Sequence, residues 1–155
     1  MSDTDDFDLQ DFLPYLLNQA ADVTSLEFQR YYKGRYGMLR TEWRVLFHLG
    51  RYGTMTAKQI SDSARIHKTK VSRAVSALEA KRFLQRERDE ADRRIERLWL
   101  SKAGQAAFKD LSAQAAKFDQ KFMAQVPEND RAALRRCLRV IADIKAPAVS
   151  HPTGR

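Results

Sequence analysis

One stretch of the chain brings together cationic and hydroxyl side chains at a spacing that suits contact with a nucleic acid. From residue 68 to residue 78, apolar residues recur at i, i+3, i+4 and i+7, which is the pattern of one helix face. The opposite face and its flanks carry Lys68, Thr69, Lys70, Ser72, Arg73 and Ser76. Arginine can donate two hydrogen bonds to a guanine edge, hydroxyl groups bond to bases or phosphates, and lysine neutralises phosphate. This face predicts a helix that lies in the major groove of DNA.

Amphipathic helices with a solvated basic face are common, so the elements on either side of this helix must decide between the two interpretations. Thr56 and Gln59 have the spacing of a capping box, which predicts a short helix from Ala57 to about Ser63. Residues 64–67 then leave room only for a tight connection. Two helices joined in this way are typical of a helix-turn-helix motif.

Two strands are predicted after the second helix, at Phe83–Arg88 and Arg94–Leu100, around a polar hairpin tip. One face of the second strand carries Ile95, Arg97 and Trp99, and the other carries Leu98 and Leu100. Since both faces hold apolar residues, we expect the second strand to be covered on both sides. Two helices followed by a basic hairpin is the order of a winged helix-turn-helix domain.

The motifs in this region resemble those of the MarR-type transcriptional regulators. The resemblance rests on the wing and the helix after it, with Asp92-Arg93-Arg94, Leu98, Leu100, Ser101 and Gly104, and on Val71-Ser-Arg-Ala-Val75 with Leu78-Glu79. These motifs span residues 39–104. One departure is that Lys81-Arg82-Phe83-Leu84 stands where the family usually has glycine and then an aliphatic pair. Without glycine, we expect the second helix to end by a route other than a left-handed cap.

The resemblance implies roles for the hairpin tip. Arg94 would enter the minor groove, Asp92 would brace it through an ion pair, and Arg93 would contact phosphate or act as the alternative reader. A narrow minor groove concentrates negative potential, and bracing limits the rotamer entropy that an inserted arginine loses. The other interpretation is a solvated charged turn, because the acidic and basic residues from Asp89 to Arg94 nearly cancel.

The resemblance also implies a small aromatic or phenolic effector that releases DNA. The candidate lining of its pocket is aromatic and comprises Phe28, Tyr32, Trp43, Phe47 and His48. Clustered aromatic residues form a core more often than a pocket, so both interpretations stay open. No cofactor is expected.

Charge is distributed unevenly along the 155 residues, which carry a net charge of +8. Residues 1–22 hold six Asp and no Lys or Arg, whereas residues 58–102 hold 13 Lys or Arg against 7 Asp or Glu. The basic excess coincides with the predicted DNA-binding stretch, as an electrostatic footprint should. A different polyanion would also fit this excess.

Long helices are predicted on both sides of the winged domain. The first runs from about Asp8, or from Leu13 if Pro14 lies in its first turn, to about Tyr32. Thr41 is the expected N-cap of a helix over residues 42–49, and glycines at 34 and 37 and at 50 and 53 are expected to end the helices before them. After the wing, Ser101 begins a helix that reaches about Val126, and the last helix covers about Glu128 to Lys145.

The terminal helices carry more apolar surface than a small winged domain requires. We therefore expect a dimerisation helix at residues 1–38, a winged helix-turn-helix domain at 39–100, dimerisation helices at 101–146 and a flexible tail at 147–155. Two recognition helices one turn of DNA apart (~34 Å) would suit a pseudo-palindromic site. The alternative is that these helices cover the winged domain within one subunit.

The inventory of reactive side chains argues against an enzyme. The three histidines lie far apart and none has metal-ligand spacing, so neither a metal site nor a catalytic residue is predicted. His67 begins the second helix of the motif, where it would contact phosphate, be solvated or cap the helix. The single cysteine, Cys137, lies on an apolar stripe between Leu134 and Leu138, which favours a small buried side chain over a redox sensor.

Absence of paired cysteines and of an apolar run of ~18–20 residues predicts a soluble cytoplasmic protein. The sequence as a whole predicts a mainly α fold with a small β-hairpin wing. Its predicted function is that of a homodimeric, sequence-specific transcriptional regulator, more specifically a repressor of a pseudo-palindromic operator. A non-specific nucleic-acid-coating protein is the alternative.

Overall fold

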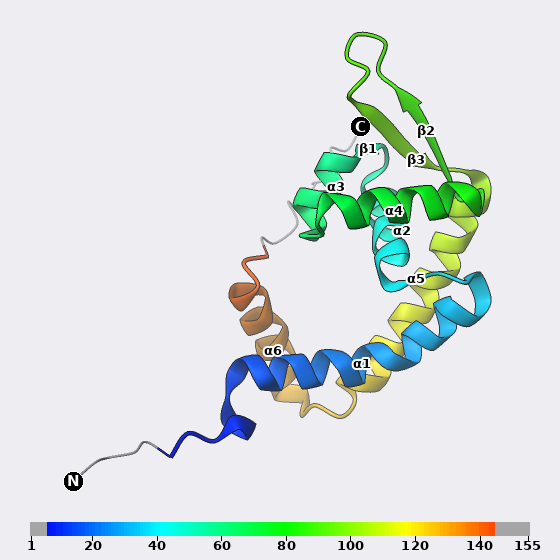
Figure 1. Ribbon diagram of the computed structural model, residues 1–155. Helices are drawn as coiled ribbons and strands as arrows, with labels where there is room; N and C mark the ends of the chain where they lie inside the picture. Colours follow the sequence, from blue (N-terminus) through cyan, green and yellow to red (C-terminus); the bar gives the residue numbers. More distant parts are fainter. Residues whose placement is uncertain (1–5, 145–155) are drawn as a thin grey trace, which may run out of the picture. The chain divides into compact units, whose positions relative to one another are not determined.

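The computed structural model describes residues 6–144 and is mainly helical, with one small antiparallel sheet (Figure 1). A 3₁₀ turn at Leu9–Asp11 precedes the first long helix. The elements that follow are α1 (Leu13–Tyr36), α2 (Arg40–Tyr52), β1 (Met55–Thr56), α3 (Ala57–Ala64), α4 (Lys68–Ala80), β2 (Leu84–Arg88), β3 (Glu96–Leu100), α5 (Lys102–Met123) and α6 (Glu128–Ile141). The predicted fold class is confirmed. The predicted tail at 147–155 lies outside the described residues.

By its internal packing the chain divides into two units, residues 1–118 and residues 119–155. The core of the first unit joins α2, α3 and α4 to the inner face of the sheet. Its fully buried side chains include Leu46 of α2, Ile60 of α3, Leu78 of α4 and Leu98 of β3. In α4 the buried residues are Val71, Ala74, Val75 and Leu78, which is the apolar stripe that the periodicity predicts.

The capping box at the start of α3 is confirmed. The Gln59 amide donates to the Thr56 hydroxyl at 3.2 Å, and the Thr56 amide donates to the Gln59 side chain at 2.9 Å. These two bonds satisfy backbone donors that the first turn of a helix cannot pair internally.

Thr56→Ala should lower the free energy of unfolding by about 1 kcal/mol, since the cap acceptor is lost and the Gln59 amide is left without a protein partner. Chemical denaturation followed by circular dichroism measures the change. Thr56→Ser keeps the hydroxyl and serves as the control; a loss of equal size in both variants would mean that the threonine methyl, and not the cap, stabilises α3.

Three predicted helix ends differ from those observed. Helix α1 continues through Gly34 to Tyr36, and only Gly37, with a φ of 63°, ends it. Helix α2 likewise continues through Gly50 to Tyr52 and ends at Gly53. Thr41 is not the N-cap of α2, because the helix begins at Arg40 and the Glu42 carboxylate accepts the backbone N–H of Leu39.

The end of α4 also differs from the prediction. Arg82 adopts a left-handed conformation with a φ of 63°, although it is not glycine. The Phe83 amide then donates to the Leu78 carbonyl at 2.9 Å, the six-to-one bond of a Schellman motif. The left-handed closure that we did not expect is therefore present, with an arginine in the strained position. From beyond the wing, the Ser101 hydroxyl donates to the Arg82 carbonyl at 2.6 Å.

The sheet has the strand order β1-β3-β2, and β3 is antiparallel to both of its neighbours. The two-residue strand β1 was not predicted; it pairs Met55 with Leu98. The prediction that both faces of β3 are covered is wrong. Leu98 and Leu100 are buried, whereas on the other side Ile95 and Arg97 are exposed and Trp99 is half-buried. The inner face alone packs on the helices.

Helix α5 begins at a very close approach between two backbones. The Gly104 amide donates to the Ser101 hydroxyl at 3.1 Å, as expected for a helix that starts at Ser101. A Cβ added at Gly104 would lie 2.0 Å from the Phe83 carbonyl oxygen. Only glycine fits there, which explains its place in the wing-and-helix motif physically.

A carboxylate of α5 accepts hydrogen bonds from two tyrosines of α1. The Tyr36 hydroxyl donates to Asp110 at 2.5 Å and the Tyr31 hydroxyl donates at 2.8 Å, with Arg35 3.4 Å away. These hydroxyls, the Tyr36 hydroxyl first, hold the pKa of Asp110 below its usual value. The cluster fixes α1 against α5, and nothing in the sequence periodicity indicated it.

The second unit contains the end of α5 and helix α6. Arg135 of α6 forms an ion pair with Asp119 at 2.7 Å, and Arg131 donates to the Val126 carbonyl at 2.9 Å. Helix α6 ends at Ile141, short of the predicted Lys145, which lies outside the described residues. None of its residues is buried within the single chain. Cys137 is exposed, so the prediction of a buried cysteine is wrong for the chain by itself.

Candidate nucleic-acid interface

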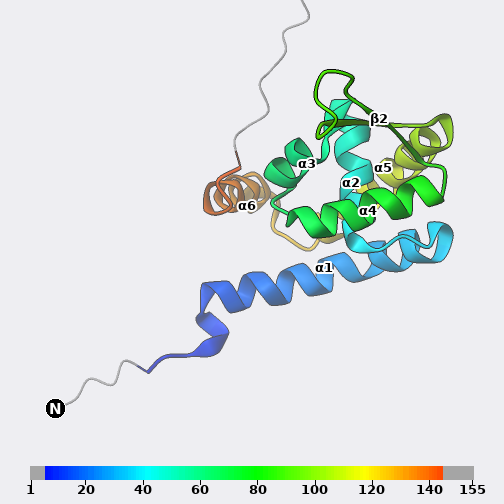
Figure 2. The ribbon, with the colours of Figure 1, turned by 45° about the horizontal axis from the view of Figure 1, so that its top comes forward.

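The outer face of α4 is fully available to a partner. The residues predicted to contact DNA are all exposed, and they are Lys68, Thr69, Lys70, Ser72, Arg73 and Ser76. The opposite face of the helix is buried against α2 and α3, so the orientation of the exposed face is fixed by the core. Figure 2 shows α4 alongside α2 and α3.

The turn between α3 and α4 is held by side chains on both sides. His67 is the N-cap of α4, where its Nδ1 accepts the Thr69 amide at 3.2 Å, so the capping role considered for His67 is observed. The Ser61 hydroxyl donates to the Ile66 carbonyl at 2.6 Å. From α2, the Arg44 guanidinium donates to the Ala64 carbonyl at 2.6 Å. Burial lowers the pKa of Arg44, a residue that the sequence did not single out.

The wing tip is ordered by two aspartates. Asp89 accepts the backbone amide of Ala91 at 2.8 Å and pairs with Arg97 at 2.5 Å. The Asp92 carboxylate accepts hydrogen bonds from Arg94 Nε at 3.1 Å and from Arg94 Nη2 at 3.2 Å. The predicted ion pair between these two residues is therefore present. The hydrogen bond from Arg94 holds the pKa of Asp92 below its ordinary value. The pair therefore persists at neutral pH and is lost only in acid.

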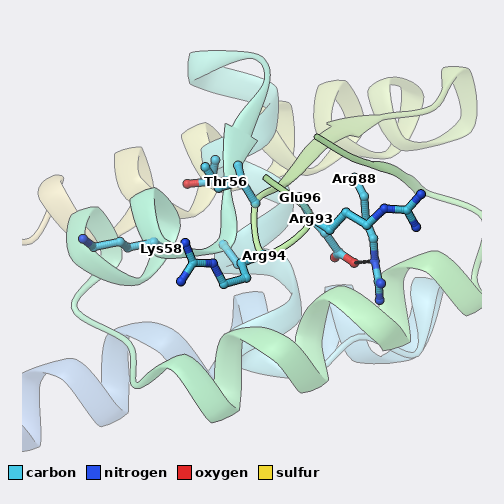
Figure 3. Close-up of a pocket in the computed structure, with 8 residues that line it drawn as sticks. Thr56, Lys58, Arg88, Arg93, Arg94 and Glu96 are labelled. Carbon is cyan, nitrogen blue, oxygen red and sulfur yellow. Dashed lines mark hydrogen bonds and ion pairs between the residues drawn. The ribbon is translucent and has the colours of Figure 1, made fainter. Parts of the chain in front are cut away.

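Arg94 is held without being buried, since 91% of its side chain is exposed. It borders a cleft between the start of α3 and the outer half of the wing, which is lined by Thr56, Ala57, Lys58, Arg88, Arg93, Arg94, Ile95 and Glu96. In Figure 3 the Arg94 side chain extends toward the side of the cleft that holds Lys58, whereas Arg93 extends the other way. The two adjacent arginines thus point in different directions, which separates the roles considered for them.

Ion pairing divides the basic residues of this region into two groups. Arg86, Arg88, Arg94 and Arg97 pair with carboxylates of α4 or of the wing. Within residues 6–144, Lys58, Lys68, Lys70, Arg73 and Arg93 form no ion pair. This second group supplies uncompensated positive charge along α4 and beside the wing. Such charge favours the binding of a polyanion.

The aromatic residues proposed for an effector pocket contact one another. Phe28 packs edge-on against Tyr32 and Trp43, with ring centroids 5.2 and 5.1 Å apart, and Trp43 packs against Phe47 at 5.5 Å. Phe28 and Tyr32 are buried in the core. His48 lies at the edge of the group, and its Nδ1 is 2.7 Å from the Arg44 carbonyl. Trp43, Phe47 and His48 remain half-buried.

Among residues 6–144, no group of three or more His, Cys, Asp or Glu side chains could hold a metal ion. In the same part of the chain, none of the helices has the length and apolar character that crossing a bilayer requires.

Known proteins match both the sequence and the fold. A sequence profile of the MarR family matches residues 36–95. The HTH-type transcriptional regulator YwoH of Bacillus subtilis (strain 168) is 26% identical over 105 residues, which are 68% of this chain and 76% of YwoH. Bordetella bronchiseptica BpsR, whose DNA binding is regulated by 6-hydroxynicotinic acid, aligns with a TM-score of 0.80 at 21% identity. Streptococcus pneumoniae FabT in complex with DNA aligns with a TM-score of 0.70 at 22% identity.

The structural matches extend over nearly whole chains. They cover 90% of this chain and 99% of BpsR, and 89% of this chain and 100% of FabT. At these identities the two structures establish the fold alone. The profile match adds the sequence evidence, because its residues 36–95 contain α2, α3, α4 and the wing tip with its Asp92–Arg94 pair. Residues 36–95 therefore match the MarR family by sequence, and the chain has the winged helix-turn-helix fold of MarR-type transcriptional regulators.

Proposed function

We propose that the protein is a repressor that binds a pseudo-palindromic operator as a homodimer. The observation that carries the proposal is the pairing of an exposed basic and hydroxyl face on α4 with an exposed, braced arginine at the wing tip. The residues proposed to contact DNA are Lys68, Thr69, Lys70, Ser72, Arg73, Ser76, Arg93 and Arg94. Helix α4 reads base edges in the major groove and Arg94 enters the adjacent minor groove. The complex of FabT with DNA supports this use of the fold.

The homodimer is supported by apolar surface that one chain leaves exposed. In the first unit this surface includes Leu13, Leu16, Val23 and Leu26 of α1. In the second unit it includes Leu134, Leu138, Ile141 and Ile144. Monomeric soluble proteins rarely expose contiguous apolar faces of this kind. A second copy covers them, and residues 1–38 and 101–146 form the dimerisation region.

We expect sedimentation equilibrium at micromolar concentration to give twice the 17.9 kDa mass of the chain. Leu134→Glu with Leu138→Glu places carboxylates on the apolar face of α6 and should shift the protein toward monomer. The control is Arg136→Glu with Arg139→Glu, which changes charge on another face of the same helix at residues that form no ion pair within the described residues. A monomeric wild-type protein would contradict the two-half-site arrangement.

Selection of bound sequences from a random duplex pool tests the function, followed by titration of the selected sequence against scrambled DNA at fixed salt. We expect an inverted repeat with half-sites about one helical turn apart, bound at least ~10³-fold more tightly than scrambled DNA. Binding without any enriched sequence, falling only with salt, would instead indicate a non-specific nucleic-acid-coating protein.

The proposal includes a small aromatic or phenolic effector at the half-buried edge of the aromatic group, beside Trp43, Phe47 and His48. The regulation of BpsR by 6-hydroxynicotinic acid supports an effector of this chemistry. A bound effector favours a spacing of the two recognition helices that no longer fits B-DNA. Once the operator is known, loss of its complex on titration with 6-hydroxynicotinic acid and related aromatic acids tests this part, with Trp43→Leu as the pocket variant.

A further inference from the structure

The outer half of the wing extends beyond the hydrophobic core. On the face of the hairpin that looks toward α4, the buried residues are Leu84, Leu98 and Leu100. Farther toward the tip the same face carries Arg86, Arg88 and Glu96, which are polar. Figure 1 shows the hairpin reaching well past the end of β1. Apolar packing therefore holds the base of the wing but not its outer half.

A ladder of ion pairs connects this outer half to the recognition helix. Arg86 of β2 binds Glu79 of α4 with two parallel bonds, Nε to Oε2 at 2.7 Å and Nη2 to Oε1 at 3.0 Å. Its third nitrogen, Nη1, donates to Glu96 of β3 at 3.3 Å. Glu96 also accepts Nε of Arg88 at 3.2 Å. One guanidinium thus joins the recognition helix to both strands of the wing.

The geometry of this contact suits positioning more than stabilisation. Glu79 is 44% exposed and Arg86 is 32% exposed, and ion pairs at such sites contribute little to the free energy of folding. A bidentate arginine–carboxylate pair is nevertheless directional, because the planar fork fixes the angle between its two partners. The hydrogen bond from Arg86 also holds the pKa of Glu79 below its usual value, so the carboxylate is charged at neutral pH.

We propose that Arg86 and Glu79 are positioning residues for DNA binding, which fix the wing relative to α4 so that Arg94 and the base-reading face of α4 reach adjacent grooves together. This inference rests on the proposed binding of double-stranded DNA. Neither residue needs to contact DNA. Their effect passes through the wing tip, where Arg94 makes the contact.

The direction in which Glu79→Ala changes DNA affinity distinguishes a positioning role from a purely electrostatic one. Glu79→Ala removes a negative charge, which by electrostatics alone would tighten binding to DNA. Loss of the ladder instead weakens binding, because a mobile wing must be ordered when Arg94 enters the groove. Glu87→Ala is the matched control: Glu87 lies one residue from Arg86 on β2, on the opposite face, and forms no ion pair within the described residues.

The experiment is a double-mutant cycle on operator affinity at fixed salt. We expect Glu79→Ala and Arg86→Met each to weaken operator binding about 5- to 20-fold, and each to add less than about 2-fold once Arg94 is alanine. Glu87→Ala should bind as tightly as wild type or more tightly. Tighter binding by Glu79→Ala, or losses that multiply independently of Arg94, would overturn the proposal.

Amide hydrogen exchange of the free protein gives a readout that needs no DNA. In Glu79→Ala, exchange of the wing amides at residues 88–96 should accelerate at least about 5-fold over wild type and Glu87→Ala, while the core of α4 is unchanged. Unchanged exchange would overturn the proposal that these ion pairs fix the wing, whatever the DNA-binding data show. If exchange is faster in Glu79→Ala but the wild-type protein prefers no operator, the proposed function is wrong although the ion pairs do hold the wing. Arg86 and Glu79 would then have no role in DNA binding.

Discussion

Lys81→Met should lower the free energy of unfolding by about 3 kcal/mol. The Glu42 side chain is only 4% exposed, and Lys81 Nζ lies 3.0 Å from its Oε1. Methionine keeps most of the aliphatic stem but removes the cation, which leaves the nearly buried Glu42 carboxyl group with only the Leu39 amide as a described hydrogen-bond donor. Urea denaturation measures the loss.

A second variant shows whether the lost pair is the cause. Glu42→Gln combined with Lys81→Met removes both charges, and glutamine still offers an oxygen to the Leu39 amide. We expect the double variant to recover most of the stability, since a buried pair can often be replaced by neutral groups at little cost. A Lys81→Met protein within about 0.5 kcal/mol of wild type would contradict the assignment, because that is the range of unremarkable surface exchanges.

Arg94→Ala should weaken operator binding about 10- to 100-fold while the dimer and the melting temperature stay unchanged. Arg94 is exposed and already paired with Asp92, so it enters a narrow groove with little further loss of rotamer freedom. A fluorescence anisotropy titration at fixed salt measures the effect on the selected operator.

Arg93→Ala is the matched comparison, because it removes the same charge from the neighbouring position. If Arg93 contacts a phosphate, Arg93→Ala should weaken binding to the operator and to scrambled DNA almost equally. The same exchange should reduce the slope of log affinity against log salt by about 1. If Arg93→Ala abolished operator preference and Arg94→Ala did not, the two arginines would exchange roles. Equal affinity in wild type and Arg94→Ala would remove the wing from recognition.

Local sequence patterns predicted the elements that local interactions determine. The i, i+3, i+4, i+7 stripe of α4 packs inward as expected, and the Thr56–Gln59 capping box needs only residues three apart. The bracing of Arg94 by Asp92 was expected from the family resemblance and is present in the structure. Its role on DNA stays a prediction.

Two of the wrong predictions concern contacts that are distant in sequence. Thr41 looked like the N-cap of α2, but the start of that helix depends on Glu42, which is paired with Lys81 at the far end of α4. Arg82 adopts a left-handed backbone where glycine was thought necessary, and Ser101 binds its carbonyl from beyond the wing. Such partners carry no periodicity, so a single sequence cannot reveal them.

The same limit applies to the site. Side-chain types identified the face of α4, because charge and hydroxyl groups there alternate with a buried stripe. The sequence did not connect Arg86 with Glu79, since seven residues and a helix-to-strand turn separate them. Two-residue strand β1 escaped notice for a simpler reason: it is too short to show any alternation.

Helix α6 buries none of its side chains within a single chain. If a second copy covers α6, the fraction of covered helix follows mass action, so dilute chains expose it and concentrated chains protect it. Proteases act on exposed segments. The lifetime of the protein should then rise with its concentration. Chains present at low concentration would be degraded faster than chains present at high concentration.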